Sequence, residues 1–286
     1  MKNITLLNIT EATQKSFDKV DDARVRYLIQ KLIEYLHLYA KETQITHEEW
    51  RDGLNFLHKS GEISDQSRSE FTLLSDVLGL SSLIDLIASK PNATEGSVLG
   101  PFHTRGSPWF TSGANLIHKN EGEPTLLRGR ITDVNNRAIN NAVVDFWQNA
   151  NNGMYWQMDD KQPQDNLRCQ MRVEEDGSFE LLTIRPKPYM VPTDGPVGQL
   201  LSMGKRNAWR PAHFHIIVEA PGYTSLITEL FDSEDPYIEQ CAVFGVRESL
   251  IKEFKLESNP ELIKKYGLTG AYLAVDCSIK LVKNLK

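Results

Sequence analysis

Apolar side chains recur at helical spacing over the first hundred residues. Across 23–41 an apolar residue returns every three or four positions, which places these side chains along one stripe of an amphipathic helix. Thr46 stands three residues before Glu49, the pattern of a capping box at a helix start. The apolar spacing resumes across 73–84, and 92–108 is rich in Gly and Pro. We predict a helical region that ends in a loop.

The pattern then changes to short alternating runs. Runs rich in Val, Ile, Phe and Thr are separated by turn residues, and this spacing is typical of a β-sandwich. The turns are expected at Asn135-Asn136, Asp176-Gly177 and Pro221-Gly222, and the last strand at 271–282. The predicted fold is α+β by content. An α-helical N-terminal domain with its linker, residues 1–105, precedes an all-β sandwich domain, residues 106–286.

The apolar stripe of 23–41 needs a partner, because a helix does not bury such a face alone. Packing against the next helix or against the β-domain is one interpretation. A surface for self-association is the other. The pattern of residues does not decide between them.

Composition narrows the range of functions. The net charge of −6 leaves no basic surface for nucleic acid or an anionic membrane. Three widely spaced cysteines without a CxxC motif are typical of a reducing compartment and of no thiolate zinc site. The first residues are too polar for a signal peptide, and no apolar run reaches membrane-spanning length. We expect a cytoplasmic protein.

The run RPAHFHIIVEA, residues 210–220, holds two histidines one residue apart. On a strand, His213 and His215 point to the same face, roughly 7 Å apart between Cα atoms, and can converge on one cation. Two solvated or hydrogen-bonded histidines remain the simpler interpretation. No HExxH motif is present, and no carboxylate stands at a recognised ligand spacing from the pair.

Tyrosine phenolate is another hard oxygen ligand, suited to ferric iron. Tyr155 follows a predicted strand in NNGMYWQMD, and Tyr189 lies in the proline-rich run RPKPYMVPTDGPVG. A buried tyrosine is more often a core aromatic with a satisfied hydroxyl. Neither tyrosine alone therefore indicates a metal site.

Several motifs together carry a family resemblance. RPKPYMVPTDGPVGQLL followed by WRPAHFHIIV resembles the signature of the intradiol ring-cleavage dioxygenases. The segments TEGSVLGPFH, LRGRITD with NAVVDFWQNANNGMY, and FTLLSDVLGLSSLID are also similar to that family. The resemblance covers most of residues 20–255. It implies a helical domain, a β-sandwich and a non-haem ferric enzyme that opens catechols with O2.

The resemblance also favours one branch of the family. The segments 46–81 and DPYIEQCAVFGVRESLI are most similar to hydroxyquinol 1,2-dioxygenases. Such an enzyme converts benzene-1,2,4-triol to 3-hydroxy-cis,cis-muconate, which tautomerises to maleylacetate. The resemblance implies one ferric ion per subunit, a homodimer formed through the N-terminal helices, and a site for lipid at that interface.

Site residues are carried over by matching motifs. The implied metal ligands are Tyr155, Tyr189, His213 and His215. The resemblance implies that Arg210 stabilises negative charge on the substrate, and we assign the role of internal base to Tyr189. Residues expected to contact substrate are Leu80, Leu99, Gly100, Pro101, Phe102, Val191 and Pro192, with Val98 as an alternative wall residue beside Leu99.

Glu229, in LITELF, departs from the family, which commonly has glutamine or histidine there. A carboxylate beside a ferric ion adds negative charge, competes for the metal or holds a proton. We hypothesise that Glu229 is protonated or hydrogen-bonded and tunes the choice of substrate. The alternative is a residue that faces away from the metal.

Two other functions remain open on the sequence. A catechol or substituted-catechol 1,2-dioxygenase, which forms cis,cis-muconates, differs only in the residues that line the substrate pocket. A β-sandwich binding module that has lost iron is the non-enzymatic alternative. Retention of all four ligand positions and Arg210 favours an enzyme over that module.

Overall fold

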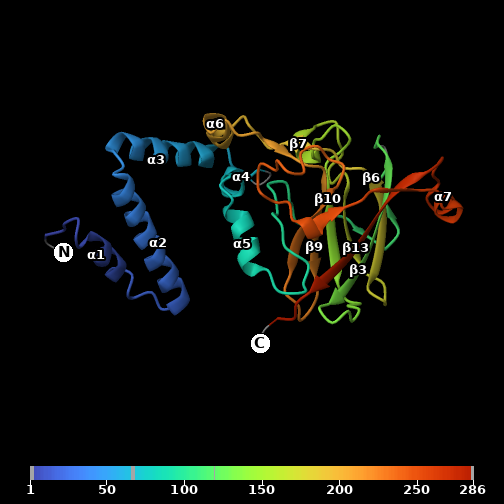
Figure 1. Ribbon diagram of the computed structural model, residues 1–286, viewed down its shortest axis with the longest axis horizontal. Coiled ribbons are helices and arrows are strands. Elements are labelled where there is room, and N and C mark those ends of the chain that lie inside the picture. Colours follow the sequence, from blue (N-terminus) through green and yellow to red (C-terminus); the bar gives the residue numbers. More distant parts are fainter. Residues whose placement is uncertain (1–2, 66–67, 119, 285–286) are drawn as a thin grey trace. The chain divides into compact units, whose positions relative to one another are not determined.

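The computed structural model describes residues 3–65, 68–118 and 120–284. It divides into two compact units, residues 1–58 and 59–286. The first unit is helical, and the second carries the sheets, which Figure 1 colours from green to red. The predicted fold class is confirmed. The helices of 70–88 belong to the second unit, and the predicted domain boundary between residues 105 and 106 stays a prediction.

The first unit contains the predicted long helix. Asp22 begins α2 by accepting hydrogen bonds from the backbone N–H groups of Arg24 and Val25. The capping box before α3 is also present, since Glu49 Oε2 accepts from Thr46 N–H at 2.8 Å and Thr46 Oγ1 accepts from Glu49 N–H at 3.2 Å. The helices are α1 (Ile9–Lys15), α2 (Ala23–Thr43) and α3 (His47–Glu62), which runs into the second unit.

The apolar pattern of 73–84 is divided between two helices, α4 (Glu70–Val77) and α5 (Leu80–Ala88). Gly79 separates them with a φ of +75°, a left-handed conformation that glycine adopts readily. In the described part of the chain, no single helix is long and apolar enough to cross a bilayer. Only α4 and α5 counted together reach that length and composition, and they are bent by 72°.

Two sheets form the predicted sandwich. Sheet A has the order β1-β5-β4-β9-β10-β11, sheet B has the order β12-β13-β3-β6-β2, and β7 pairs with β8. Sheet A comprises β1 (Trp109–Phe110), β4 (Val143–Trp147), β5 (Arg168–Arg172), β9 (His213–Glu219), β10 (Leu226–Asp232) and β11 (Ile251–Lys252). Sheet B comprises β2 (Ala114–Asn115), β3 (Pro124–Asp133), β6 (Ser178–Ile184), β12 (Lys255–Glu257) and β13 (Tyr272–Leu281).

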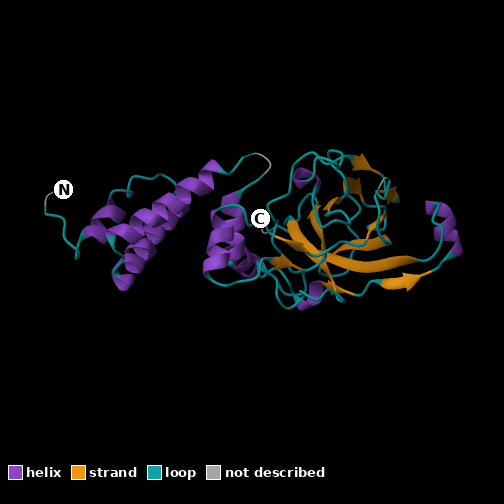
Figure 2. Cartoon of the chain, turned by 90° about the horizontal axis from the view of Figure 1, so that it is seen from above, coloured by secondary structure: helices purple, strands orange, loops and turns teal. Residues whose placement is uncertain are grey.

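Short elements fill the connections. The apolar pattern did not predict α6 (Pro196–Met203) or α7 (Pro260–Tyr266). Each begins with proline, which suits the first turn of a helix. In Figures 1 and 2, α7 lies beyond the ends of the long strands. The remaining elements are β7 (Tyr189–Met190), β8 (Trp209–Arg210) and the 3-10 turns η1 (Trp156–Met158) and η2 (Glu248–Leu250).

The core lies between the two sheets. On β9, Phe214, Ile216 and Val218 face it, and they pack with residues from sheet B such as Leu181 and Val275. Because side chains alternate along a strand, the residues between them face the other side of sheet A. That outer face carries the histidine pair. That part of the face is also buried, since His213 and His215 are 2% and 1% exposed, whereas Glu219 at the end of β9 is exposed.

Candidate metal centre

The histidine pair lies on the outer face of sheet A, as its spacing predicts. His213 Nε2 and His215 Nε2 are 3.1 Å apart. The carbonyl oxygen of Pro211 lies 2.6 Å from His213 Nδ1, which places the proton on Nδ1 and leaves Nε2, beside Arg210 NH1 and His215, as the nitrogen with a lone pair for a metal. A backbone carbonyl on the far nitrogen is the usual way to orient a ligating imidazole.

Both predicted tyrosines reach this pair. Tyr155 precedes η1, Tyr189 begins β7, and their side chains are 2% and 4% exposed. Tyr155 Oη lies 3.1 Å from His215 Nε2. The two phenol rings meet edge to face with centroids 5.3 Å apart. Neighbouring ligands of an ion with bonds of about 2.0–2.1 Å are roughly 3 Å apart, so these distances suit a common cation.

Burial controls the charge of the four side chains. It lowers the pKa of His213 and of His215 well below the usual value, with the Arg210 guanidinium adding to the effect. Both imidazoles are therefore neutral, the form that binds metals. Burial raises the pKa of Tyr155 and Tyr189. The phenolates that suit a hard cation need positive charge nearby, and a bound cation supplies it.

Arg210 and Glu229 form a buried ion pair beside the histidines. Arg210 NH2 donates to Glu229 Oε1 at 2.6 Å, and Arg210 NH1 lies 3.5 Å from Tyr189 Oη. Glu229 Oε1 is also 3.2 Å from His215 Nδ1. Arg210 is 1% exposed and Glu229 is fully buried. The guanidinium therefore stands close enough to the site to stabilise negative charge in it.

The sequence left open whether Glu229 faces the histidines or turns away from them. The residue lies directly opposite His215 because β9 and β10 pair antiparallel. Its carboxylate and the two imidazoles form the only cluster of His, Cys, Asp or Glu in the described residues whose ligand atoms could together hold a metal. Glu229 thus does not face away from the site.

Hydrogen bonding bears on the protonation of Glu229. Ser97 Oγ lies 2.6 Å from Glu229 Oε2 and 2.7 Å from the carbonyl oxygen of Gly245. A hydroxyl group has one hydrogen, so Ser97 cannot donate to both acceptors. A proton on Glu229 would satisfy all three oxygens. Burial raises the pKa of Glu229, while Arg210 opposes the rise.

The expected substrate loop adjoins this cluster. Gly100 has a φ of +73°, and a Cβ there would lie 3.1 Å from His215 Cε1, so the position requires glycine. Phe102 stacks on Tyr155 with ring centroids 4.7 Å apart. Val191 is buried two residues after Tyr189, whereas Leu80 begins α5 with 53% of its surface exposed. Leu99, Pro101 and Pro192 are partly buried, and Val98 is buried.

Four residues of this region were not singled out from the sequence. Trp147 stacks on His215 with centroids 4.6 Å apart and planes at 4°. Asp76, on α4, is 1% exposed, and its Oδ2 has no hydrogen-bond partner. The others are Ser97 and Arg168. Trp147 lies in the quoted run NAVVDFWQ, but its place beside His215 follows only from strand register.

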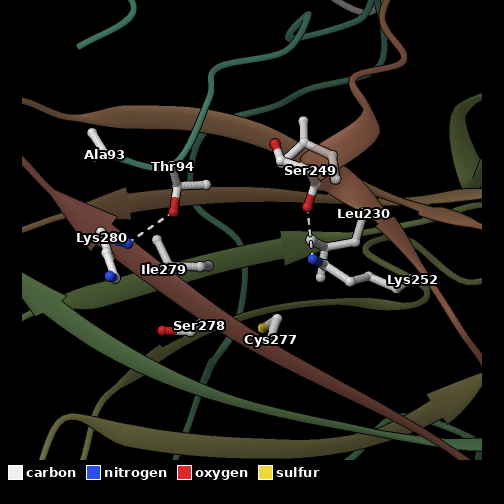
Figure 3. Close-up of a pocket in the computed structure, with 10 residues that line it drawn as sticks. Ala93, Thr94, Leu230, Ser249, Lys252, Cys277, Ser278, Ile279 and Lys280 are labelled. Carbon is white, nitrogen blue, oxygen red and sulfur yellow. Dashed lines mark hydrogen bonds between the residues drawn. The ribbon is translucent and has the colours of Figure 1, made fainter. Parts of the chain in front are cut away.

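A separate hollow of about 150 Å³ lies between β13 and β10–β11 (Figure 3). Its polar side chains include Lys252 and Lys280, which the close-up shows at opposite ends, and no histidine, tyrosine or carboxylate lines it. It therefore lacks the donor types of a hard metal site.

Two family models match the chain. The one described as Dioxygenase matches residues 100–269, and the one described as Catechol dioxygenase N terminus matches residues 22–96. A hydroxyquinol 1,2-dioxygenase of Rhizobium sp. is 40% identical over 267 residues, covering 92% of this chain and 90% of that protein. An intradiol ring-cleavage dioxygenase of Aspergillus niger is 37% identical over 286 residues, covering 99% and 87%.

Solved structures of dioxygenases resemble this chain over most of its length. Hydroxyquinol 1,2-dioxygenase from Pseudomonas putida is 38% identical with a TM-score of 0.83, over 98% of this chain and 99% of that one. Catechol 1,2-dioxygenase from Acinetobacter radioresistens, 23% identical with a TM-score of 0.84 over 100% and 96%, shares the fold. These relatives are named as enzymes, which speaks against a binding module. The chain belongs to the intradiol ring-cleavage dioxygenases, the family its histidine and tyrosine motifs resemble.

Proposed function

We propose that the chain binds one ferric ion per subunit through Tyr155, Tyr189, His213 and His215, and opens a catecholic ring between its two hydroxyl-bearing carbons. The convergence of two phenols and two neutral imidazoles in one buried site carries the proposal. Hard phenolate oxygens with imidazole nitrogens suit ferric iron. The carbon–carbon bond breaks, and both atoms of O2 enter the product as carboxyl oxygens.

We infer that the substrate is hydroxyquinol, benzene-1,2,4-triol. Relatives of Rhizobium and Pseudomonas bear the name hydroxyquinol 1,2-dioxygenase. Asp76 gives a second reason, because its buried Oδ2 lacks a partner. Burial raises the pKa of this carboxyl group, and the Arg210 guanidinium is near enough to lower it. An unpaired buried acceptor favours a ring with a further hydroxyl group to donate to it.

The side chains divide the remaining work. A bound ferric ion would supply the Lewis acidity that favours loss of the diol's protons and prepares the ring for O2. We assign one of these protons to Tyr189 as internal base; burial raises the pKa of Tyr189 and of Tyr155, so the phenolate of either is basic enough to accept it. Arg210, paired with Glu229, stabilises the negative charge of the deprotonated ring. Phe102 and Val191 supply apolar walls that exclude water.

Oxygen uptake tests the substrate. We expect faster uptake per enzyme with benzene-1,2,4-triol than with catechol, 4-chlorocatechol or an alkyl catechol. Asp76→Asn should narrow the preference for the triol by about tenfold, because the buried hydrogen bond from the third hydroxyl group of the ring is weakened. A preference for catechol that Asp76→Asn leaves unchanged would assign the enzyme to the catechol branch instead.

Colour tests the metal site. We expect iron analysis to give one ion per chain and a visible absorption band from charge transfer between tyrosinate and iron. Tyr155→Phe should shift or bleach the band, and Tyr223→Phe should leave it unchanged, because Tyr223 packs against the core of the sandwich. A colourless wild-type protein that takes up no iron contradicts the proposed site.

We also propose a homodimer formed through the N-terminal helices, with lipid at the interface. Support comes from α2, which has no buried residue in the described structure and exposes Leu28, Leu32 and Leu36. An exposed apolar stripe of this length is stabilised when another apolar surface packs against it. Light scattering tests for the dimer, and mass spectrometry of a solvent extract tests for the lipid. A monomer without lipid contradicts both.

We propose a cytoplasmic location. The three cysteines are free, which is usual in a reducing compartment. Cell fractionation with an antibody to the chain tests this location.

A further inference from the structure

Four buried side chains form a row across four neighbouring strands of sheet A. Arg168 on β5 lies opposite Trp147 on β4, Trp147 lies opposite His215 on β9, and His215 lies opposite Glu229 on β10. Each is 2% exposed or less. The row therefore links Arg168, two strands away from β9, to the proposed ligand His215.

Trp147 links the two ends of this row. Its ring stacks flat on the imidazole of His215, with planes at 4°. The Arg168 guanidinium carbon lies 5.8 Å from the centroid of the same indole. A buried cation near an aromatic ring is attracted to its electrons. Arg168 thus helps to fix the ring that sets the orientation of His215.

Arg168 also holds the loop that carries the expected substrate contacts. NH1 donates to the carbonyl oxygen of Phe102 at 3.2 Å, and NH2 donates to that of Thr104 at 2.6 Å. The guanidinium donates further to Ser107 Oγ, at 3.1 and 3.3 Å. Phe102 in turn stacks on Tyr155. One side chain therefore contacts the surroundings of two proposed ligands.

The partners of Arg168 explain why arginine is suited to this place. Asp145 stands nearby, but it accepts its hydrogen bonds from Ser107 Oγ and Gln170 Nε2. The identified donors of Arg168 go to two carbonyl oxygens and one hydroxyl group. A planar fork with five N–H groups reaches several such acceptors at fixed angles, which an ammonium group does not.

We propose that Arg168 is a positioning residue, which holds the loop of residues 102–107 and the Trp147 ring so that Tyr155 and His215 keep their places. It touches neither substrate nor metal. The effect of Arg168 on activity rests on the proposed function. The effect of Arg168 on the loop does not, because it is a property of the protein without metal. The two can therefore be tested separately.

The test compares Arg168→Met and Arg168→Lys with Arg172→Met, a matched control on the same strand whose side chain is exposed. Hydrogen exchange on the metal-free protein should show faster exchange over 102–107 in both Arg168 variants and not in the control. In the iron-loaded protein, kcat/KM should fall by about 10-fold to 100-fold, the effect of misplacing a site by about 1 Å. The charge-transfer band should shift while the iron content stays the same.

Ser107→Ala provides a milder variant that removes one acceptor of Arg168. Ser107→Ala should also make hydrogen exchange over 102–107 faster, but by less than the Arg168 variants do. The proposal can therefore still be tested if Arg168→Met fails to fold. If the Arg168 variants exchange over 102–107 at the wild-type rate and keep the wild-type kcat/KM and absorption band, the proposal is overturned. If the wild-type protein binds no iron and cleaves no ring, the proposed function fails, and the exchange measurement still decides the role of Arg168.

Discussion

Both faces of β9 are buried over residues 213–216, but the side chains on the two faces differ in chemistry. The inner face presents Phe214, Ile216 and Val218 to the sandwich core, and each is 0% exposed. The outer face presents His213 and His215, surrounded by Tyr155 and Arg210. Apolar burial stabilises the fold, whereas burying titratable groups costs stability unless they find partners. The comparison indicates that the inner face supports folding and the outer face supports chemistry.

Removal of an outer-face ligand should give the largest change in activity. His215→Ala is expected to abolish iron binding and oxygen uptake, because one of the four proposed ligands is lost. The free energy of unfolding of the metal-free protein should fall by about 1–3 kcal/mol, because the cost of the cavity is partly offset by removal of a buried polar group. Iron analysis and urea unfolding measure the two effects. Full iron content in this variant would contradict the assignment of the outer face of β9 to metal binding.

Removal of an inner-face ring should do the reverse. Phe214→Ala is expected to lower the free energy of unfolding by about 3–5 kcal/mol, the usual cost of deleting a buried phenylalanine. The fraction that stays folded should still bind iron and retain its colour, because Phe214 points away from the proposed ligands. Urea unfolding of the metal-free protein, beside iron content per folded chain, checks both statements. A large loss of iron at unchanged stability would contradict them.

Glu229, on the strand next to the outer-face histidines, should make the stability of the protein depend on pH. Because its pKa is raised in the folded chain, mainly by burial, the carboxyl group contributes stability below its unfolded pKa. This contribution is lost as pH rises through the folded value. Glu229→Gln removes the titration, so the melting temperature of the metal-free variant should depend less on pH in that window. Thermal melts at successive pH values measure the difference.

The same variant tests the effect of Glu229 on catalysis. Its pH–rate profile should flatten on the side where Glu229 loses its proton, and the order of preferred substrates should change. An unchanged profile with an unchanged order of substrates would remove Glu229 from the proposed mechanism.

The smallest effect is expected at the hollow shown in Figure 3. Lys280→Met should change the free energy of unfolding by about 0.5 kcal/mol or less, the usual size for a partly exposed site without a buried network. Iron content and oxygen uptake should match the wild-type protein. A clear loss of activity would show that a change in this hollow alters the metal site.

Local patterns were sufficient for much of the fold. The stripe of 23–41 predicted α2, and the Thr46 and Glu49 pair predicted the start of α3. Interactions that span only a few residues determine such features. The pattern of 73–84 did not reveal the break between α4 and α5, because a single glycine in a helical pattern is compatible with either outcome.

Sequence motifs predicted some residues of the candidate site and missed others. The four proposed ligands and Arg210 came from motifs, and their roles stay predictions. Asp76 and Arg168 carried no local signal, since buried charged residues look like surface ones in a sequence. Glu229 was noticed only because it departs from the family, and its contact with His215 spans two strands.

Sequence by itself determined the change from a helical region to a β-sandwich, the shared face of His213 and His215, and the family. These follow from periodicity and from motifs in which the informative residues are close together. Only the tertiary structure decided which distant residues meet: Tyr155 with His215, Glu229 with Arg210, and Arg168 with Trp147. Strand register sets these contacts, and register depends on packing over the whole sheet, which no short run of residues contains.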